Sequence, residues 1–236
     1  MIFARRRFGR DNYLYLLAEG GDAALVDPAD PETALEVSRL HGVHPRWIVH
    51  THGHADHSGG SARLREELGA EVVGHAADAA WFRPDLDLAG EPELVLGALR
   101  IRVHAVPGHT PGSVLLEWLG KLLTGDTLFW SGCGNCRHGG DPARLAASFR
   151  EVFPGLDPRL EVHPGHDYAE ANLPFVLGRE PSNTAAAGRL AAVRAARAAG
   201  IEPEATELGE EILVNPFLRA GGDGPFVELR ALRDRW

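Results

Sequence analysis

The segment from Trp47 to Gly60, WIVHTHGHADHSGG, concentrates side chains that bind metal ions. A β-rich run is followed by His52, His54, Asp56 and His57, which are four ligand-type residues within six positions. In an H-x-H pair on an extended backbone, both imidazoles point the same way. Asp56 and His57 follow on the turn into the next helix, where they can face a second ion. Histidine and carboxylate donors without a thiolate suit zinc, iron or manganese.

Three later segments each place one further donor at the end of a β-rich run. His109 lies in VPGHTPGS, Asp126 in LLTGDTLF and His166 in VHPGHDY. A single turn of this kind is more typical of structure than of chemistry, because Gly, Pro and Asp are ordinary turn residues. The occurrence of all three after the first segment predicts one shared metal site.

Strands and helices alternate over the part of the chain that carries these residues. The predicted strands are residues 13–18, 23–27, 47–51, 99–106 and 114–119. Asp30 can cap a helix that Pro31 opens and Gly42 ends, and residues 61–68 form a second short helix. Loops at strand ends would then carry the metal ligands, which is where functional residues are commonly found.

The pattern changes from about residue 168. Asn183 caps an alanine-rich helix that ends at Gly200, and clear strand signals disappear. Pro174 and Gly178 interrupt the helix before it. We expect a mostly helical C-terminal region.

Composition excludes several classes of protein. The chain has 236 residues and a net charge of −9, with no arginine cluster that includes interleaved aromatics, which argues against a nucleic-acid partner and favours a small-molecule substrate. No run approaches the roughly 20 apolar residues of a membrane helix, and no signal-peptide core follows Arg5–Arg7. With only Cys133 and Cys136, a reducing cytoplasm is expected. Nothing in the sequence indicates an oligomeric state.

The order H-x-H-x-D-H, His, Asp, His resembles the metallo-β-lactamase superfamily at all seven positions, over roughly Asn12 to His166. The resemblance implies an α/β fold, a four-layer αβ/βα sandwich with the metals at one edge between two sheets. It also implies two divalent ions, with zinc first and iron or manganese as alternatives. It assigns His52, His54 and His109 to the first ion, Asp56, His57 and His166 to the second, and Asp126 to both.

Three stretches resemble the glyoxalase II (hydroxyacylglutathione hydrolase) branch, namely GDTLFWSGCGNCRHGGDP, GHDYAEANLPFVLGREPSN and LGEEILVNPFLR. They imply a catalytic domain at 1–167 and a helical region at 168–236 that covers the active site. Tyr168 and Arg219 become candidate substrate contacts. Asn135 and Arg137 stand where that family has a lysine and an aromatic. Arg137 can still bind a carboxylate with two hydrogen bonds.

The expected reaction follows from the metal chemistry. Two divalent ions lower the pKa of a shared water toward about 7, so that a bridging hydroxide can attack. Thioesters such as S-lactoylglutathione or a related acyl-thiol are suitable substrates, because a thiolate leaving group has a pKa of only roughly 8 to 9. Asp56 would orient the hydroxide. The expected catalytic set is Asp56, His52, His54, His109 and Asp126.

Two alternatives remain open from the sequence. The persulfide dioxygenases of the same superfamily use one iron on positions that match His52, His109 and Asp126, and residues 132–142 resemble that branch about equally. The other reading is a thiol-redox or non-enzymatic module that uses Cys133 and Cys136. A lone C-x-x-C pair is weak evidence, and burial of either thiol would exclude the redox role.

Overall fold

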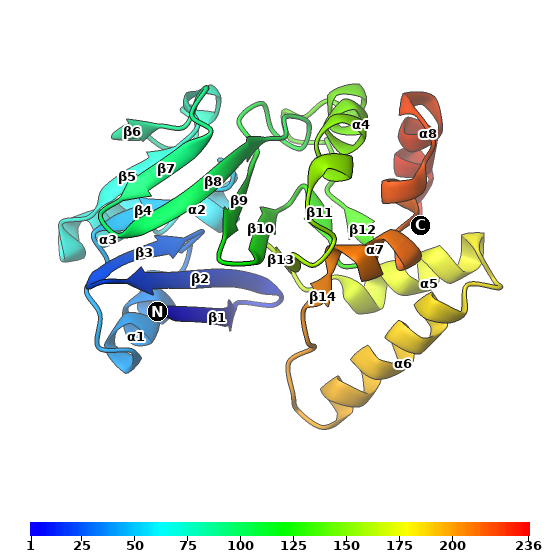
Figure 1. Ribbon diagram of the computed structural model, residues 1–236, viewed down its shortest axis with the longest axis horizontal. Coiled ribbons are helices and arrows are strands. Elements are labelled where there is room, and N and C mark those ends of the chain that lie inside the picture. Colours follow the sequence, from blue (N-terminus) through cyan, green and yellow to red (C-terminus); the bar gives the residue numbers. More distant parts are fainter.

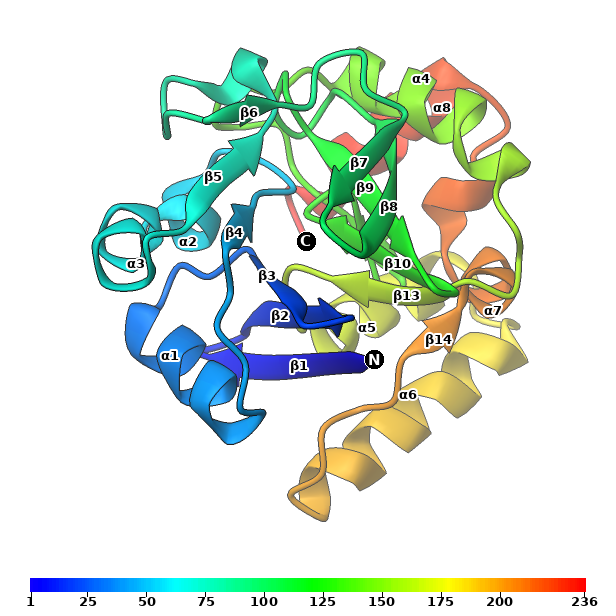
Figure 2. The ribbon, with the colours of Figure 1, turned by 60° about the vertical axis from the view of Figure 1, so that its left-hand side comes forward.

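Two sheets packed face to face form the centre of the computed structural model, which describes all 236 residues (Figures 1 and 2). The first sheet has the order β1 (Ile2–Phe8), β2 (Asn12–Glu19), β3 (Asp22–Val26), β4 (Trp47–Val49), β5 (Glu71–Gly74) and β6 (Leu86–Asp87). Strands β1 to β3 pair antiparallel, and β3 to β6 pair parallel.

The second sheet has the order β14 (Thr206–Glu207), β13 (Glu161–Pro164), β10 (Lys121–Gly125), β9 (Val114–Trp118), β8 (Leu99–Ala105) and β7 (Glu93–Leu96). Its strands pair antiparallel except for β10 and β13, which are parallel. A short hairpin, β11 (Leu128–Phe129) with β12 (Gly132–Cys133), follows β10.

Helices cover the outer faces of both sheets. On the first sheet lie α1 (Pro31–Leu40), α2 (Ala55–Ser58) and α3 (Ser61–Leu68); the 3-10 turn η1 (Ala76–Asp78) follows β5. On the second lie α4 (Pro142–Glu151) and η2 (Phe153–Gly155), and at its far end lie α5 (Ala169–Arg179), α6 (Thr184–Ala198), α7 (Leu208–Val214), η3 (Pro216–Arg219) and α8 (Asp223–Arg233) (Figure 1). The expected αβ/βα sandwich is confirmed.

Strand alternation divides the core into two clusters. Along β2, Tyr15 and Leu17 face the second sheet, whereas Leu14 and Leu16 face α1 and α3. All four are at most 2% exposed. Burying one such leucine contributes roughly 1.5–3 kcal/mol, so both faces of β2 hold layers together.

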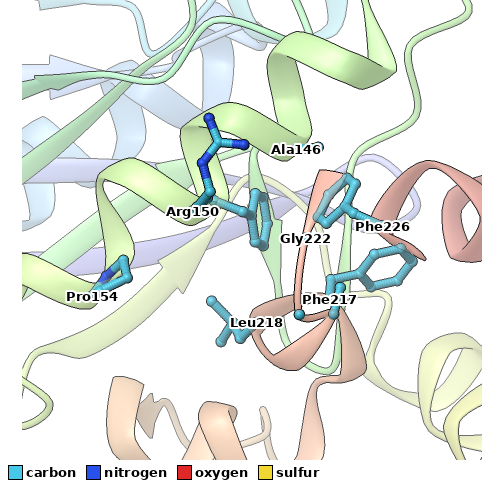
Figure 3. A pocket seen from close by; sticks show the side chains of 10 residues that line it. Ala146, Arg150, Pro154, Phe217, Leu218, Gly222 and Phe226 are labelled. Atoms are coloured by element: carbon cyan, nitrogen blue, oxygen red, sulfur yellow. The ribbon is translucent and has the colours of Figure 1, made fainter. Parts of the chain in front are cut away.

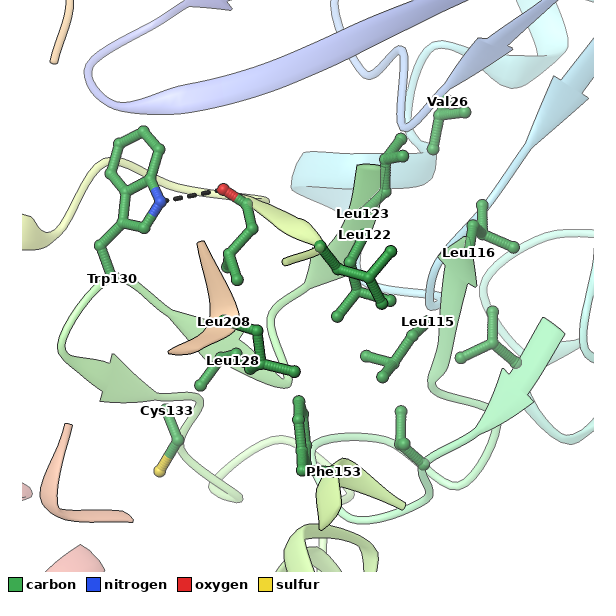
Figure 4. Close-up of a cluster of buried hydrophobic side chains, with 14 of the residues drawn as sticks. Val26, Leu115, Leu116, Leu122, Leu123, Leu128, Trp130, Cys133, Phe153 and Leu208 are labelled. Atoms are coloured by element: carbon green, nitrogen blue, oxygen red, sulfur yellow. Dashed lines mark hydrogen bonds between the residues drawn. The ribbon is translucent and has the colours of Figure 1, made fainter. Parts of the chain in front are cut away.

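The larger cluster continues through the second sheet to its outer helices. Leu115 and Leu122 pack there with Phe153 from η2 and with Leu208 from α7 (Figure 4). The buried indole N–H of Trp130 donates to the carbonyl of Val162 at 3.0 Å, which satisfies its only polar atom. The C-terminal helices therefore share one core with the sandwich.

The predicted strands and helices are confirmed, with ends that differ by up to two residues. Two expectations about the C-terminal region are wrong in detail. β14 (Thr206–Glu207) adds a short strand to the second sheet, because its backbone pairs with β13. Helix α5 continues through Pro174, since burial of its neighbours Leu173 and Phe175 outweighs the lost backbone hydrogen bond. No helix combines the length and apolar composition that a membrane crossing requires.

Candidate metal centre

The ends of five elements bring the seven predicted ligands to one edge of the sandwich. His52 and His54 follow β4, and α2 carries the next pair. His109 lies in the loop between β8 and β9. Asp126 follows β10 and His166 follows β13, and because these strands are parallel neighbours, their C-terminal ends deliver both side chains to the same place.

Three groups of potential ligand atoms form there. One includes Asp27 with His52 and His57, and the other two match the predicted ligand sets. The donor atoms of the first group lie within 4.8 Å of one another, as do those of the second; the first group is His52, His54 and His109, and the second is Asp56, His57 and His166. Asp126 lies between the groups. One of its oxygens is 3.3 Å from His57 Nε2, and the other is 3.6 Å from His109 Nε2 and 3.5 Å from His166 Nε2.

Hydrogen bonds outside the first group fix which ring nitrogens face inward. His109 Nδ1 donates to the carbonyl of Asn135 at 2.6 Å, and His54 Nε2 donates to the carbonyl of His138 at 3.0 Å. In the neutral rings, His109 Nε2 and His54 Nδ1 are therefore unprotonated. These two nitrogens face each other at 2.9 Å.

The second group repeats this arrangement with carboxylates as the outer partners. His57 Nδ1 donates to Asp27 at 3.1 Å, and His166 Nδ1 donates to Asp11 at 2.9 Å. Their Nε2 atoms face each other at 3.2 Å and are the nitrogens left to bind a cation. A carboxylate behind a ligating imidazole fixes its tautomer and raises its basicity.

His52 completes the set. The Thr51 hydroxyl donates to Asp27, so its oxygen is free to accept from His52 Nδ1 at 3.2 Å. His52 Nε2 is buried and has no partner, and the same holds for Oδ1 of Asp126. Five imidazoles and two carboxylates thus converge at this edge of the sandwich. This donor set fits two divalent cations of the zinc, iron or manganese type.

The pKa values agree with a site for positive charge. Burial raises the pKa of Asp126, but the imidazoles of His166 and His57 outweigh it and bring the pKa down to about 2. Burial lowers the pKa of His57, yet the carboxylates of Asp126 and Asp27 more than offset this and raise it. Burial holds the pKa of His52 well below its usual range, so its ring is a neutral donor. Protons compete with cations here, and metal binding releases them.

The ligands open into a cavity of about 410 Å³. Its walls include Trp81, Phe129 and Tyr168. The Tyr168 ring stacks on His166 with ring centres 4.8 Å apart, and the Trp81 ring meets His54 edge to face at 5.4 Å. Of the predicted substrate contacts, Tyr168 and Asn135 line this cavity.

A second cavity of about 230 Å³ adjoins the first, and Phe129, Asn135 and Tyr168 line both. It also contains three guanidinium groups, those of Arg137, Arg230 and Arg233, and one carboxylate, that of Asp234, which pairs with Arg137 and Arg230. We call it the arginine cavity. Such a cavity suits an anionic ligand.

Arg219 lies elsewhere. Its guanidinium pairs with Glu180 at 2.8 Å, and it lines neither cavity, so the structure does not bring this predicted contact to the site. The arginines that do lie there from the C-terminal region, Arg230 and Arg233, come from α8. They were missed because RALR near the end of a helix is ordinary favourable charge placement.

The thiol-redox reading is contradicted. Cys133 is buried, and burial raises its pKa to about 11; Cys136 is half-buried, and burial raises its pKa to about 12. The reactive form of cysteine is the thiolate, which these environments disfavour.

Another groove, of about 260 Å³, lies between α4 and the segment from η3 to α8 (Figure 3). Phe149, Phe217 and Phe226 are among the residues that line it. Its only charged side chain is Arg150, which forms ion pairs with Glu151 and Asp223. This groove lacks groups that could perform the expected chemistry.

Comparisons with known proteins place this geometry in context. The model of the metallo-beta-lactamase superfamily matches residues 8–167, and that of the hydroxyacylglutathione hydrolase C-terminus matches residues 167–236. A hydroxyacylglutathione hydrolase of Anaeromyxobacter dehalogenans (strain 2CP-C) is 63% identical over 254 residues, with 100% of both chains covered.

Two solved structures are also similar. ETHE1 from Myxococcus xanthus superposes with a TM-score of 0.76 at 25% identity, over 98% of this chain and 90% of that one. TTHA1623, crystallised in a di-iron-bound form, gives a TM-score of 0.66 at 28% identity, over 91% of this chain and 100% of that one.

Proposed function

This chain belongs to the hydroxyacylglutathione hydrolases of the metallo-β-lactamase superfamily, and from that premise we propose that it hydrolyses hydroxyacyl thioesters of glutathione. It is a metal-dependent hydrolase that acts on a thioester. The observation that carries the proposal is the convergence of five imidazoles and two carboxylates beside an arginine-lined cavity.

The seven residues divide into two proposed metal sites. His52, His54 and His109 hold the first cation, and Asp56, His57 and His166 hold the second; Asp126 contacts both. We propose zinc as the resident ion, because the donors are histidine and carboxylate, although the di-iron form of TTHA1623 makes iron the alternative to test. Bound divalent cations supply Lewis-acid activation of a water and of the thioester carbonyl.

The chain's own residues position the reactants. Asp56 is the one ligand with a largely exposed side chain, so a free oxygen can accept a hydrogen bond from the attacking water and orient it. Hydrogen bonding to His166 holds the pKa of Asp56 well below its usual range, so it remains an acceptor. Trp81 and Phe129 wall the cavity and limit the access of bulk water to the acyl group.

The arginine cavity would orient the substrate relative to the metal ligands. Glutathione carries two carboxylates, and we propose that Arg137 and Arg233 bind the glycyl end of the thiol carrier while Asn135 and Tyr168 contact its middle. Arg233 has no carboxylate partner, which leaves its charge available. The acyl group would then lie toward Trp81. Residues 1–167 form the catalytic domain of this proposal, and residues 168–236 supply the arginines of α8.

The cellular setting is the last part of the proposal. Both cysteines are free thiols, and cytosolic glutathione is the thiol carrier that the arginine cavity suits. We therefore place the enzyme in the cytoplasm.

One experiment tests the reaction and separates it from the dioxygenase alternative. Protein reconstituted with zinc or with iron is given S-lactoylglutathione under air, and thiol release and oxygen uptake are followed together. We expect thiol release without oxygen uptake, and none with Asp126→Ala. Oxygen uptake by the iron form with glutathione persulfide, and no thiol release from the thioester, would replace hydrolysis by the persulfide dioxygenase reaction.

A further inference from the structure

Asp78 is a fully buried carboxylate that no metal ligand touches. It lies in η1, is 0% exposed and forms no ion pair. A buried charge is costly unless strong hydrogen bonds and a nearby opposite charge compensate it. The burial of Asp78 therefore has a free-energy cost that its surroundings must offset.

The hydrogen bonds of Asp78 go to the two loops that carry the first metal group. Its Oδ2 accepts from the backbone N–H of Gly53 at 2.8 Å, and Gly53 lies between His52 and His54 in the sequence. The same oxygen accepts from the hydroxyl of Thr110 at 2.6 Å, next to His109. One carboxylate oxygen thus joins the loop after β4 to the loop before β9.

A third bond completes the junction. Oδ1 of Asp78 accepts from the N–H of Gly112 at 2.9 Å. Ser113 holds Thr110 in place, because its oxygen accepts from the Thr110 N–H at 3.0 Å and lies 2.8 Å from the Thr110 hydroxyl. Both loops are therefore fastened by their backbones to the same carboxylate.

The approach of the two loops depends on glycine at both contact points. A Cβ at Gly53 would lie 2.9 Å from Cβ of Asp78 and 2.6 Å from the Trp81 ring. A Cβ at Gly112 would lie 2.8 Å from Cγ of Asp78. Glycine at both positions therefore allows the two loops to approach Asp78 this closely.

We propose that Asp78 is the positioning residue of the first metal group: it fixes the spacing of His52, His54 and His109 through its hydrogen bonds to Gly53 and Thr110. The inference rests on the proposed metal centre. Outer-sphere partners of metal ligands affect affinity by roughly ten- to a hundredfold when they are removed. The effect of Asp78 should be largest at the first cation, since none of its hydrogen bonds goes to α2 or to the loop after β13, which carry the second group.

The test measures zinc affinity one site at a time. His166→Ala disables the second group and leaves the first, and His109→Ala does the reverse. Metal-free full-length protein in each background is titrated with zinc against a chromophoric chelator, with and without Asp78→Asn. We expect Asp78→Asn to weaken zinc binding roughly ten- to a hundredfold in the His166→Ala background. In the His109→Ala background it should change the affinity less than twofold.

A matched pair at Thr110 keeps the test decisive if Asp78→Asn does not fold. Thr110→Val removes the hydroxyl that donates to Asp78, and Thr110→Ser keeps it. We expect Thr110→Val to weaken the first site several-fold and Thr110→Ser to match the parent. Equal effects in both backgrounds, or no difference between valine and serine, would overturn the role of Asp78. A parent protein that binds no zinc would instead overturn the metal centre itself.

Discussion

The two metal groups have similar inner ligands but are supported by different chemistry. In the second group, the rings of His57 and His166 are each backed by a carboxylate, from Asp27 and Asp11. In the first group, His54 and His109 are backed only by backbone carbonyls. The carboxylates near the first group act through an intervening residue, Asp27 through Thr51 and Asp78 through Gly53.

This difference predicts unequal affinities. Carboxylate-backed imidazoles are more basic and bind cations more tightly, and the second group also contains Asp56. The carbonyls behind the first group belong to residues 135–138, which also line the substrate cavities. The first site should therefore be the weaker one and the one that responds to substrate.

Removing the shared ligand Asp126 should abolish the difference in zinc affinity between the two sites. Asp126→Ala takes a carboxylate from both groups, and we expect both zinc ions to be lost under dialysis. Activity should fall by about 10³-fold, since Lewis-acid stabilisation is worth several kcal/mol. Metal analysis and thiol release measure the two effects. Retention of either ion at wild-type affinity would show that Asp126 does not bridge the groups.

Neutralising Asp11, the carboxylate that accepts from His166, should reduce the difference in zinc affinity between the two sites. Asp11→Asn keeps an oxygen that can accept from His166 but removes the charge. We expect zinc at the second site to bind roughly tenfold more weakly, with the first site unchanged. Asp141→Asn, at the start of α4 and bonded only to backbone N–H groups of that helix, is the matched control. An equal effect of Asp11→Asn on both sites would contradict the comparison.

Ligand binding should strengthen the first site alone. S-methylglutathione in the arginine cavity would order residues 135–138, whose carbonyls hold His54 and His109. We expect about a fivefold gain in zinc affinity at the first site and none at the second, a modest coupling of the usual size. Arg233→Ala should remove the gain. A gain in zinc affinity at the second site would show that ligand binding does not act through the carbonyls of residues 135–138.

The pKa of Glu211, a buried carboxyl group that is not a metal ligand, is shifted in the opposite direction to the pKa values of Asp56 and Asp126. Burial raises the pKa of Glu211 to about 7, and the hydrogen bonds from the Ser131 N–H and the Thr206 hydroxyl and the charge of Arg189, which lower it, do not offset the effect of burial. A raised pKa favours the folded state at low pH. That contribution is present below the unfolded pKa of about 4.5 and is lost as pH rises through about 7.

Thermal unfolding measures this smallest effect. From pH 5 to pH 8 the wild type should lose a few degrees of Tm relative to Glu211→Gln, which cannot ionise. The difference between the two proteins should be flat above pH 8. A difference that does not change between pH 5 and pH 8 would show that Glu211 does not titrate there.

The inner ligands could be predicted from the sequence, and their supports could not. The spacing of His52, His54, Asp56 and His57 is dense enough to stand out. Asp27, in contrast, looks like a turn residue after a strand, since V-D-P is a common way to end one. Its bonds to Thr51 and His57 exist only after β3 and β4 pair.

The strands, too, were predictable from the sequence only in part. Strands β2 and β3 were predictable because both of their faces are apolar, but β1 reads IFARRRF and resembles a charged surface segment. All three of its arginines are partly buried, and Arg5 packs over the rings of Tyr13 and Trp130 at 4.9 and 5.2 Å. Arg233 was missed for a related reason, since only tertiary packing brings the end of α8 to a cavity.

The bridge between Asn12 and His166 joins the first hairpin to the end of β13 and closes a segment of more than 150 residues. Contacts between residues so distant along the chain form late in folding, because the loop entropy must be overcome first. His166 cannot meet Asp56 or His57 until that closure is complete. The cation of the second group therefore binds after this closure, and its binding energy slows unfolding more than it speeds folding.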